Sequence, residues 1–139
     1  MSETFLPLVP DGWLKSYLTA MVECDNEMPL PFHFLAGASV IGNMIGLDAW
    51  ATLVRGVRIY PNINAMLLSP AGKCRRGEGT KITMAIARRA GVNVFAGKTT
   101  PEGLVDDLAD NGNLILYVEE LSMLLTKQDF QRPMIPVLT

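Results

Sequence analysis

The chain has 139 residues, about the length of one domain. Apolar residues make up 49% of it and charged residues 19%, a composition that supports a packed core and excludes a largely disordered chain. The formal net charge of -2 excludes a protein that coats nucleic acid through an overall basic surface, and leaves room only for a local basic patch.

The cysteines and the apolar stretches indicate in which cellular compartment the protein is expected. Cys24 and Cys74 lie far apart and form no CxxC pair, which argues against a disulfide framework or a zinc site and fits a reducing cytoplasm. The first residues include an acid where a signal peptide would have basic residues. No apolar stretch reaches the ~20 residues that a membrane span needs. We therefore expect a cytoplasmic protein with no membrane partner.

The first third of the chain predicts two helices. Asp11 suits the N-cap of a helix from about Gly12 to Cys24, in which apolar residues recur at helical spacing. A second helix is expected to start at Pro31, because proline is tolerated in a first turn. Residues 32–46 are apolar on most sides of this helix, as is typical of a buried one.

Aromatic residues and the single histidine in this part have structural interpretations. His33 lies between two phenylalanines, which favours a packed, hydrogen-bonded histidine over a catalytic one. Trp13, Tyr17 and Trp50 are interpreted as core residues rather than platforms for stacking bases.

The middle of the chain has an extended pattern. Segments 51–54 and 57–60, joined at Arg55–Gly56, predict a hairpin. Residues 64–68 form an unbroken apolar run, which is typical of a strand covered on both faces of a parallel sheet. A glycine- and arginine-rich segment, Ser69–Gly79, follows; we call it the glycine loop. We expect a helix over 80–89 after it.

The last third alternates strands and helices. Residues 92–95 predict a buried strand, and Thr100-Pro-Glu opens a helix with a cap, an N1 proline and a first-turn acid, ending near Asn111–Gly112. Residues 114–118 form the clearest strand. This succession predicts an α/β fold with a parallel sheet, here incomplete, over residues 49–139, preceded by a helical segment over residues 1–48.

The glycine loop has the composition of a phosphate-binding site. Glycines let backbone N–H groups converge on an anion, and a helix that follows adds partial positive charge. A cation must reach the β- and γ-phosphates and a hydroxyl must hold Mg²⁺. The candidate residues for binding the nucleotide are Gly72, Lys73, Arg75, Arg76, Gly77, Gly79 and Thr80.

The strict motif G-x-x-x-x-G-K-[ST] is not met. Gly72 and Gly77 have its spacing, but Glu78 then stands at the lysine position. In a second register Arg76 stands for the lysine and Gly77 for the hydroxyl residue, so Thr80 would have to reach the metal from one turn further on. The alternative is a basic surface turn that binds nothing, or one that contacts a nucleic-acid backbone.

A pair of acids follows the last clear strand. Glu119 and Glu120 resemble a Walker B element, in which one carboxylate lies near the metal and the next polarises the attacking water. Such acids belong at the carboxyl edge of a parallel sheet, where α/β proteins keep their ligand sites. The alternative is a strand that leaves the core for solvent, or acids at the positive end of a helix over 121–125.

Six segments in order resemble one family: Pro31-Phe-His-Phe-Leu-Ala-Gly, Tyr60-Pro-Asn-Ile-Asn, Gly72-Lys-Cys-Arg-Arg-Gly, Thr100-Pro-Glu-Gly-Leu, Glu119-Glu-Leu-Ser and Met134-Ile-Pro-Val-Leu-Thr. Together, over residues 11–139, they look like the RecA-like P-loop ATPase domain of phage and prophage replication proteins of helicase or primase–helicase type. The resemblance rests on order and spacing.

This resemblance implies an ATP-hydrolysing DNA replication protein in a bacterial host cell, with ATP and Mg²⁺ as cofactors, single-stranded or forked DNA as partner, and a ring of identical subunits. Glu119 would be the Walker B acid that holds the metal, and Glu120 the catalytic base. Further strands follow Walker B in the family, so we expect this chain to be an N-terminal part that does not hydrolyse ATP at a useful rate alone.

Two other functions stay open. One is a degenerate P-loop module that does not hydrolyse nucleotide and serves assembly or partner loading. The other is a small regulatory domain whose basic loop contacts nucleic acid, with an affinity that falls steeply with salt.

Overall fold

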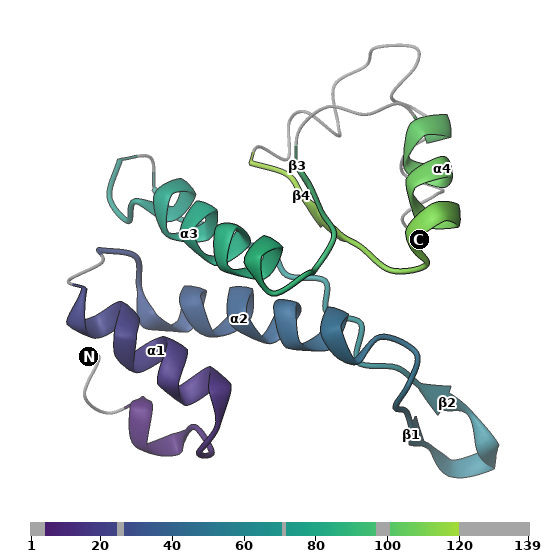
Figure 1. Cartoon of the computed structure of the whole chain (residues 1–139). Coiled ribbons are helices and arrows are strands. Elements are labelled where there is room, and N and C mark those ends of the chain that lie inside the picture. Colours follow the sequence, from purple (N-terminus) through teal and green to yellow (C-terminus); the bar gives the residue numbers. More distant parts are fainter. Residues whose placement is uncertain (1–4, 25–26, 71, 97–100, 120–139) are drawn as a thin grey trace. The chain divides into compact units, whose positions relative to one another are not determined.

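The computed structural model describes residues 5–24, 27–70, 72–96 and 101–119 (Figure 1). The chain divides into two compact units, Met1–Gly91 and Val92–Thr139. The first unit is mostly helical, and the second contains a small parallel sheet and one helix. The fold is therefore mixed, with helices and strands in both units.

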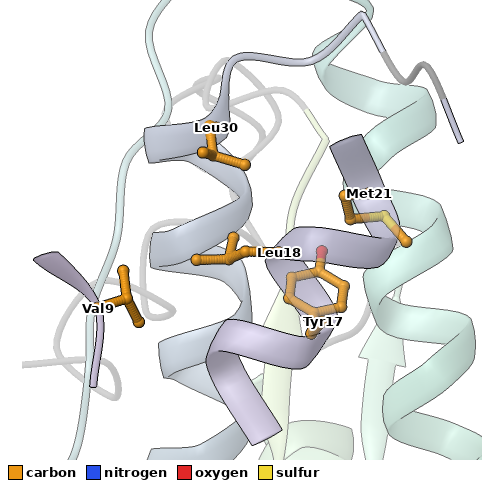
Figure 2. Close-up of a cluster of buried hydrophobic side chains, with 5 residues drawn as sticks. All are labelled: Val9, Tyr17, Leu18, Met21 and Leu30. Carbon is orange, nitrogen blue, oxygen red and sulfur yellow. The ribbon is translucent and has the colours of Figure 1, made fainter. Parts of the chain in front are cut away.

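The first unit is built on three helices: α1 (Trp13–Glu23), α2 (Leu30–Ile45) and α3 (Arg76–Arg89). Helix α2 packs against both α1 and α3. A short 3-10 turn, η1 (Leu6–Leu8), precedes them and contacts α1. The buried cluster of this unit comes from η1's flank and from α1 and α2, as Figure 2 shows: Val9, Tyr17, Leu18, Met21 and Leu30.

The two predicted N-terminal helices are confirmed, with a correction at the first cap. Helix α1 is capped by Gly12, and the carboxylate of Asp11 instead lies 2.6 Å from Lys15 Nζ. That hydrogen bond, with the attraction of the two charges, lowers the pKa of Asp11. Pro31 lies in the first turn of α2 as predicted. Gly37 of α2 lets Leu14 and Tyr17 of α1 approach closely.

The predicted hairpin is confirmed as β1 (Ala51–Thr52) and β2 (Arg58–Ile59), an antiparallel pair in which Ala51 lies opposite Ile59. A 3-10 turn, η2 (Val54–Gly56), joins the strands, and Arg55 and Gly56 both have positive φ there. The chain returns from β2 across α2 at Gly42, where an added Cβ would collide with the carbonyl oxygen of Pro61. Only glycine permits this crossing.

The predicted buried strand at 64–68 was wrong. These residues have no regular structure, and Met66 and Leu68 are 60% and 73% exposed. Among the residues that the structure describes, no strand pairs with this segment. An unbroken apolar run predicts a strand only where neighbouring strands cover it. In the described part of the first unit, the hairpin strands are the only strands.

The second unit contains β3 (Val94–Ala96), α4 (Pro101–Asn111) and β4 (Ile115–Tyr117). Strands β3 and β4 are parallel, with Val94 opposite Ile115 and Ala96 opposite Tyr117. Leu104 of α4 is 1% exposed and is the buried centre of that helix. The predicted strand–helix–strand succession is therefore confirmed, and its parallel pairing with it. The division into a helical segment over residues 1–48 and an incomplete P-loop core over residues 49–139 stays a prediction.

Candidate functional site

The glycine loop ends earlier than predicted, because α3 begins at Arg76 rather than at Thr80. The chain enters the helix through two residues in the left-handed region, Gly72 at φ 74° and Arg75 at φ 33°. Gly72 adopts this conformation at little cost, whereas a non-glycine residue there costs roughly 1–2 kcal/mol. Strain of this kind in Arg75 is typical of ligand-binding segments.

The first turn of α3 has no side-chain cap. Arg75 is the N-cap residue and makes no capping hydrogen bond, while its carbonyl accepts from the amides of Glu78 and Gly79 at 3.1 Å. A 14-residue helix without a cap presents its first amides and its partial positive charge to whatever lies before it. An anion is the natural ligand for such an end.

Two of the three loop cations lie at the surface beside this turn. Lys73 and Arg75 are exposed. Glu27 holds Arg75, with its Oε2 2.9 Å from Arg75 Nε, and Glu78 Oε2 lies 3.7 Å from Arg75 Nη1. The charge on Arg75 is therefore already shared with two carboxylates, which an incoming anion would have to displace.

The third cation has a structural contact. Arg76 is partly buried, and its Nη1 donates a hydrogen bond of 2.8 Å to the carbonyl oxygen of Leu67. This bond ties the irregular segment 64–68 to the start of α3. The residue that takes the place of the P-loop lysine by position thus binds the backbone of the segment just before the glycine loop.

Gly79 and Thr80, both predicted to bind the nucleotide, face the interior. An added Cβ at Gly79 would lie 2.6 Å from Met28 Sδ, so the glycine lets α3 pack on the segment before α2. Thr80 is 6% exposed, and its hydroxyl donates to the carbonyl of Arg76 at 2.8 Å. Gly77 lies half-buried in the first turn. The structure therefore brings Gly72, Lys73 and Arg75 to the surface before α3.

A buried chain of hydrogen bonds lies behind this turn. Thr83 Oγ1 donates to the carbonyl of Gly79 at 3.1 Å and lies 2.5 Å from the hydroxyl of Tyr17, which lies 2.8 Å from His33 Nδ1. Each hydroxyl has one proton, so Tyr17 donates to Thr83 and accepts from the Nδ1–H of His33. Three helices are joined through this chain.

Burial sets the ionisation of the two titratable members of the chain. The pKa of His33 is lowered and that of Tyr17 is raised, in both cases mainly by removal from solvent. Both groups are therefore neutral at physiological pH. His33 is 1% exposed, which confirms its interpretation as a packed histidine. Of the aromatic residues assigned to the core, only Tyr17 is buried, since Trp13 and Trp50 are 44% and 47% exposed.

The predicted acids lie in the other unit. Glu119 is exposed and follows β4 by two residues, at the carboxyl end of a parallel pair. This is the edge at which α/β sheets hold ligands. Glu120 lies outside the described residues. The loop belongs to the first unit and Glu119 to the second, so their meeting at one phosphate stays a prediction.

Several neighbours of the site could not be found from the sequence. Glu27 and Met28 contact the start of α3 from about 50 residues upstream, and Tyr17 reaches Thr83 from 66 residues upstream. None has a motif. Glu27 lies before Pro29 and α2, and no spacing rule links it to Arg75.

Within the described ranges, no three His, Cys, Asp or Glu side chains gather in a way that could hold a metal ion. None of the helices described there is both long and apolar enough to cross a membrane. Comparisons with protein family models, with curated proteins and with solved structures found no match for the chain.

Proposed function

We propose that the chain binds the phosphates of ATP at the start of α3, and that it is the nucleotide-binding part of a DNA replication protein of helicase type. The observation that carries the proposal is the uncapped first turn of α3, reached through left-handed Gly72 and Arg75. Backbone amides that converge before a helix are the basis of phosphate binding in P-loop proteins.

The residues around this turn fit a polyphosphate. Lys73 is exposed and supplies a compact charge, and Arg75 supplies a guanidinium that can bind two phosphate oxygens at once. The ion pair with Glu27 is exposed on both sides, at 59% and 60%, so it contributes little and yields readily to a phosphate. Arg76 keeps the loop in place through Leu67.

The fit to Mg²⁺ is poorer. Thr80 would have to supply a hydroxyl to the metal, yet it is buried against Met28 and bonded to the carbonyl of Arg76. Glu119 has the right chemistry for a metal at the carboxyl end of β4. The loop is therefore assigned to the phosphates alone.

Calorimetric titration tests the proposal. We expect Mg-ATP and ADP to bind and AMP to bind more weakly, because the loop contacts the outer phosphates. Replacing both Lys73 and Arg75 with alanine should weaken ATP binding about tenfold or more, since each charge-assisted hydrogen bond contributes roughly 1.5–3 kcal/mol. Arg89→Ala removes an exposed cation from the other end of the same helix and should leave binding unchanged. Equal effects of the two changes, or no binding by the wild type, would exclude this site.

A second candidate is a module that binds nucleotide without hydrolysing it. Its support is the structural use of two residues: Arg76, which stands at the lysine position, and Thr80, which would have to supply the metal-binding hydroxyl from one turn beyond Gly77. The experiment that separates the two functions is a phosphate-release assay on the longest form of the protein that binds ATP. Turnover that is lost in Glu120→Gln supports the ATPase, and tight binding without turnover supports the module.

A further inference from the structure

The chain has two cysteines, and both thiols are free. Cys24 is the C-cap residue of α1 and is exposed, and its backbone N–H donates to the carbonyl oxygen of Ala20 at 3.0 Å. Cys74 lies in the glycine loop just before α3 and is partly buried. The nucleotide site proposed above uses neither thiol.

Two contacts bring together the segments that contain these cysteines. Glu27 Oε2 lies 2.9 Å from Arg75 Nε, and Met28 packs against Gly79 in the first turn of α3. The contact advances along α3 as the chain advances from Glu27 to Met28, so the two segments run in the same direction. This course directs the residues before Glu27 toward the residues before Arg75. Figure 1 shows the end of α1 and the start of α3 at the same end of α2.

The glycine loop can bring the Cys74 thiol to Cys24. Cys74 is the neighbour of Arg75 in the sequence, and Cys24 is three residues before Glu27, a stretch that spans at most ~11 Å between Cα atoms. A disulfide needs Cα atoms about 4.4–6.8 Å apart. Cys74 lies outside α3 and follows the left-handed Gly72, so changes in the backbone dihedrals of the loop move its thiol without disturbing the helix.

We propose that Cys24 and Cys74 form a reversible disulfide when the surrounding glutathione pool becomes oxidised. The exposed Cys24 thiolate attacks glutathione disulfide and releases one glutathione, and the Cys74 thiolate then attacks the Cys24 sulfur of the mixed disulfide and releases the second. Each departing glutathione thiolate takes up the proton that a cysteine has lost. Two protein thiols are thus oxidised, and one glutathione disulfide is reduced to two glutathiones. The exposed cations Lys73 and Arg75 flank Cys74 and attract the anionic glutathione.

This disulfide ties the glycine loop to the end of α1. A reducing cytoplasm keeps such a pair reduced, so the bond is a sensor of oxidation and differs from the structural framework that the cysteine spacing argues against. One consequence rests on the proposed function. The bond keeps Arg75 beside Glu27, which ATP must displace, so the oxidised chain should bind ATP roughly fivefold more weakly than the reduced chain.

A redox titration of the full chain tests the disulfide. The protein is equilibrated with mixtures of reduced and oxidised glutathione and quenched with acid, and mass spectrometry measures the peptide that contains both cysteines linked. The ratio of squared glutathione to glutathione disulfide at half-oxidation gives the effective concentration of one thiol at the other. We expect this value to be at least ~tenfold higher in the folded chain than in the urea-unfolded chain, because folding brings the two segments together.

Four variants show whether the contact at Arg75 is the cause. Glu27→Gln removes the ion pair and should lower the effective concentration two- to fivefold, by roughly the strength of an exposed pair. Asp11→Asn removes an exposed ion pair near the other end of α1 and should leave it unchanged. Cys24→Ser and Cys74→Ser should each form only a mixed disulfide with glutathione. Equal effective concentrations in the folded and unfolded chains, or mixed disulfides on both cysteines of the folded wild type, would overturn the proposal.

Calorimetric titration of the oxidised and reduced chains with ATP tests the consequence for the nucleotide site. Weaker binding by the oxidised chain that dithiothreitol restores supports it, and equal binding by the two forms overturns it. A reduced chain that does not bind ATP overturns the proposed function instead. The glutathione titration contains no nucleotide, so it decides the disulfide in either case.

Discussion

The two sides of α3 are built for different purposes. On its inner side, Gly79 packs against Met28 and Thr83 takes part in a buried chain of hydrogen bonds that reaches Tyr17 and His33. At its start, the amides have no side-chain cap and Lys73 and Arg75 are exposed. The inner side of α3 is therefore buried against neighbouring residues, whereas its N-terminus is uncapped and lies beside exposed cations. Residues of the glycine loop that are neighbours in the sequence thus differ in role: Gly79 serves packing, and Lys73 and Arg75 are available to a ligand.

The largest expected effect is on the interior. Tyr17→Phe removes the acceptor for His33 Nδ1–H and the donor to Thr83, and leaves a buried N–H without its partner. An unsatisfied buried group of this kind costs roughly 1–3 kcal/mol. Urea unfolding should show this loss, while ATP affinity per folded molecule stays unchanged. A fall in affinity at full stability would break the separation between the two sides of α3.

A substitution at Gly79 tests whether this glycine serves packing or phosphate binding. Gly79→Ala places a Cβ against Met28 Sδ and Cβ, and such overpacking costs about 1–3 kcal/mol. If the glycine serves packing, Met28→Ala should relieve part of this cost in the double variant, as a thermodynamic cycle will measure. If the glycine serves phosphate binding, the double variant would regain stability and still bind ATP poorly.

Because His33 is buried, we expect the free energy of unfolding to depend on pH. Burial lowers the pKa of His33 below 6.5 in the folded chain, so the unfolded chain takes up the proton first as the pH falls. The contribution of His33 to stability is then complete above pH 6.5 and declines below it, down to the folded pKa. Free energies of unfolding measured from pH 8 to 5 should show this decline, and His33→Asn, which keeps an N–H near the Nδ1 position, should lack it.

The smallest expected effect is a change in ATP affinity at the N-terminus of α3. Glu27→Gln frees the guanidinium of Arg75 from its exposed ion pair. Stability should change by less than about 0.5 kcal/mol, whereas ATP affinity should rise by a factor of roughly two to five, because exposed pairs contribute ~0.2–1 kcal/mol. Asp11→Asn removes another exposed ion pair far along the chain from the loop and is the matched control. A lower affinity in Glu27→Gln would show that Arg75 does not contact the nucleotide.

Local signals in the sequence predicted most elements. Helical spacing and prolines located α1, α2 and α4, and Arg55–Gly56 located the hairpin turn, because these features act within a few residues. The apolar run 64–68 misled the prediction of a strand, since pairing depends on a neighbour that no local pattern reveals. The assignment of Trp13 and Trp50 to the core was wrong, because their exposure depends on packing between distant residues that the sequence does not record.

The candidate site was predicted in part. A helix after the glycine loop was confirmed, but the sequence did not reveal that α3 starts at Arg76 and that Gly79 and Thr80 face inward. That inward side depends on packing between distant parts of the chain, such as the approach of Met28 to Gly79 and of Tyr17 to Thr83. The roles of Glu119 and Glu120 stay predictions.

The chain crossing at Gly42 fixes one end of the hairpin segment, whereas the turn at its other end can tolerate changes in length. The carbonyl of Pro61 lies so close to this glycine that the chain is held in register on α2 there, whereas nothing lies within 4 Å of the Cβ position of Gly56 at the turn. Added residues at the turn would lengthen the hairpin outward without shifting the anchor, and a single deletion between 59 and 63 would pull the anchor out of register. The turn is therefore the natural place to graft a tag or a foreign loop onto this protein.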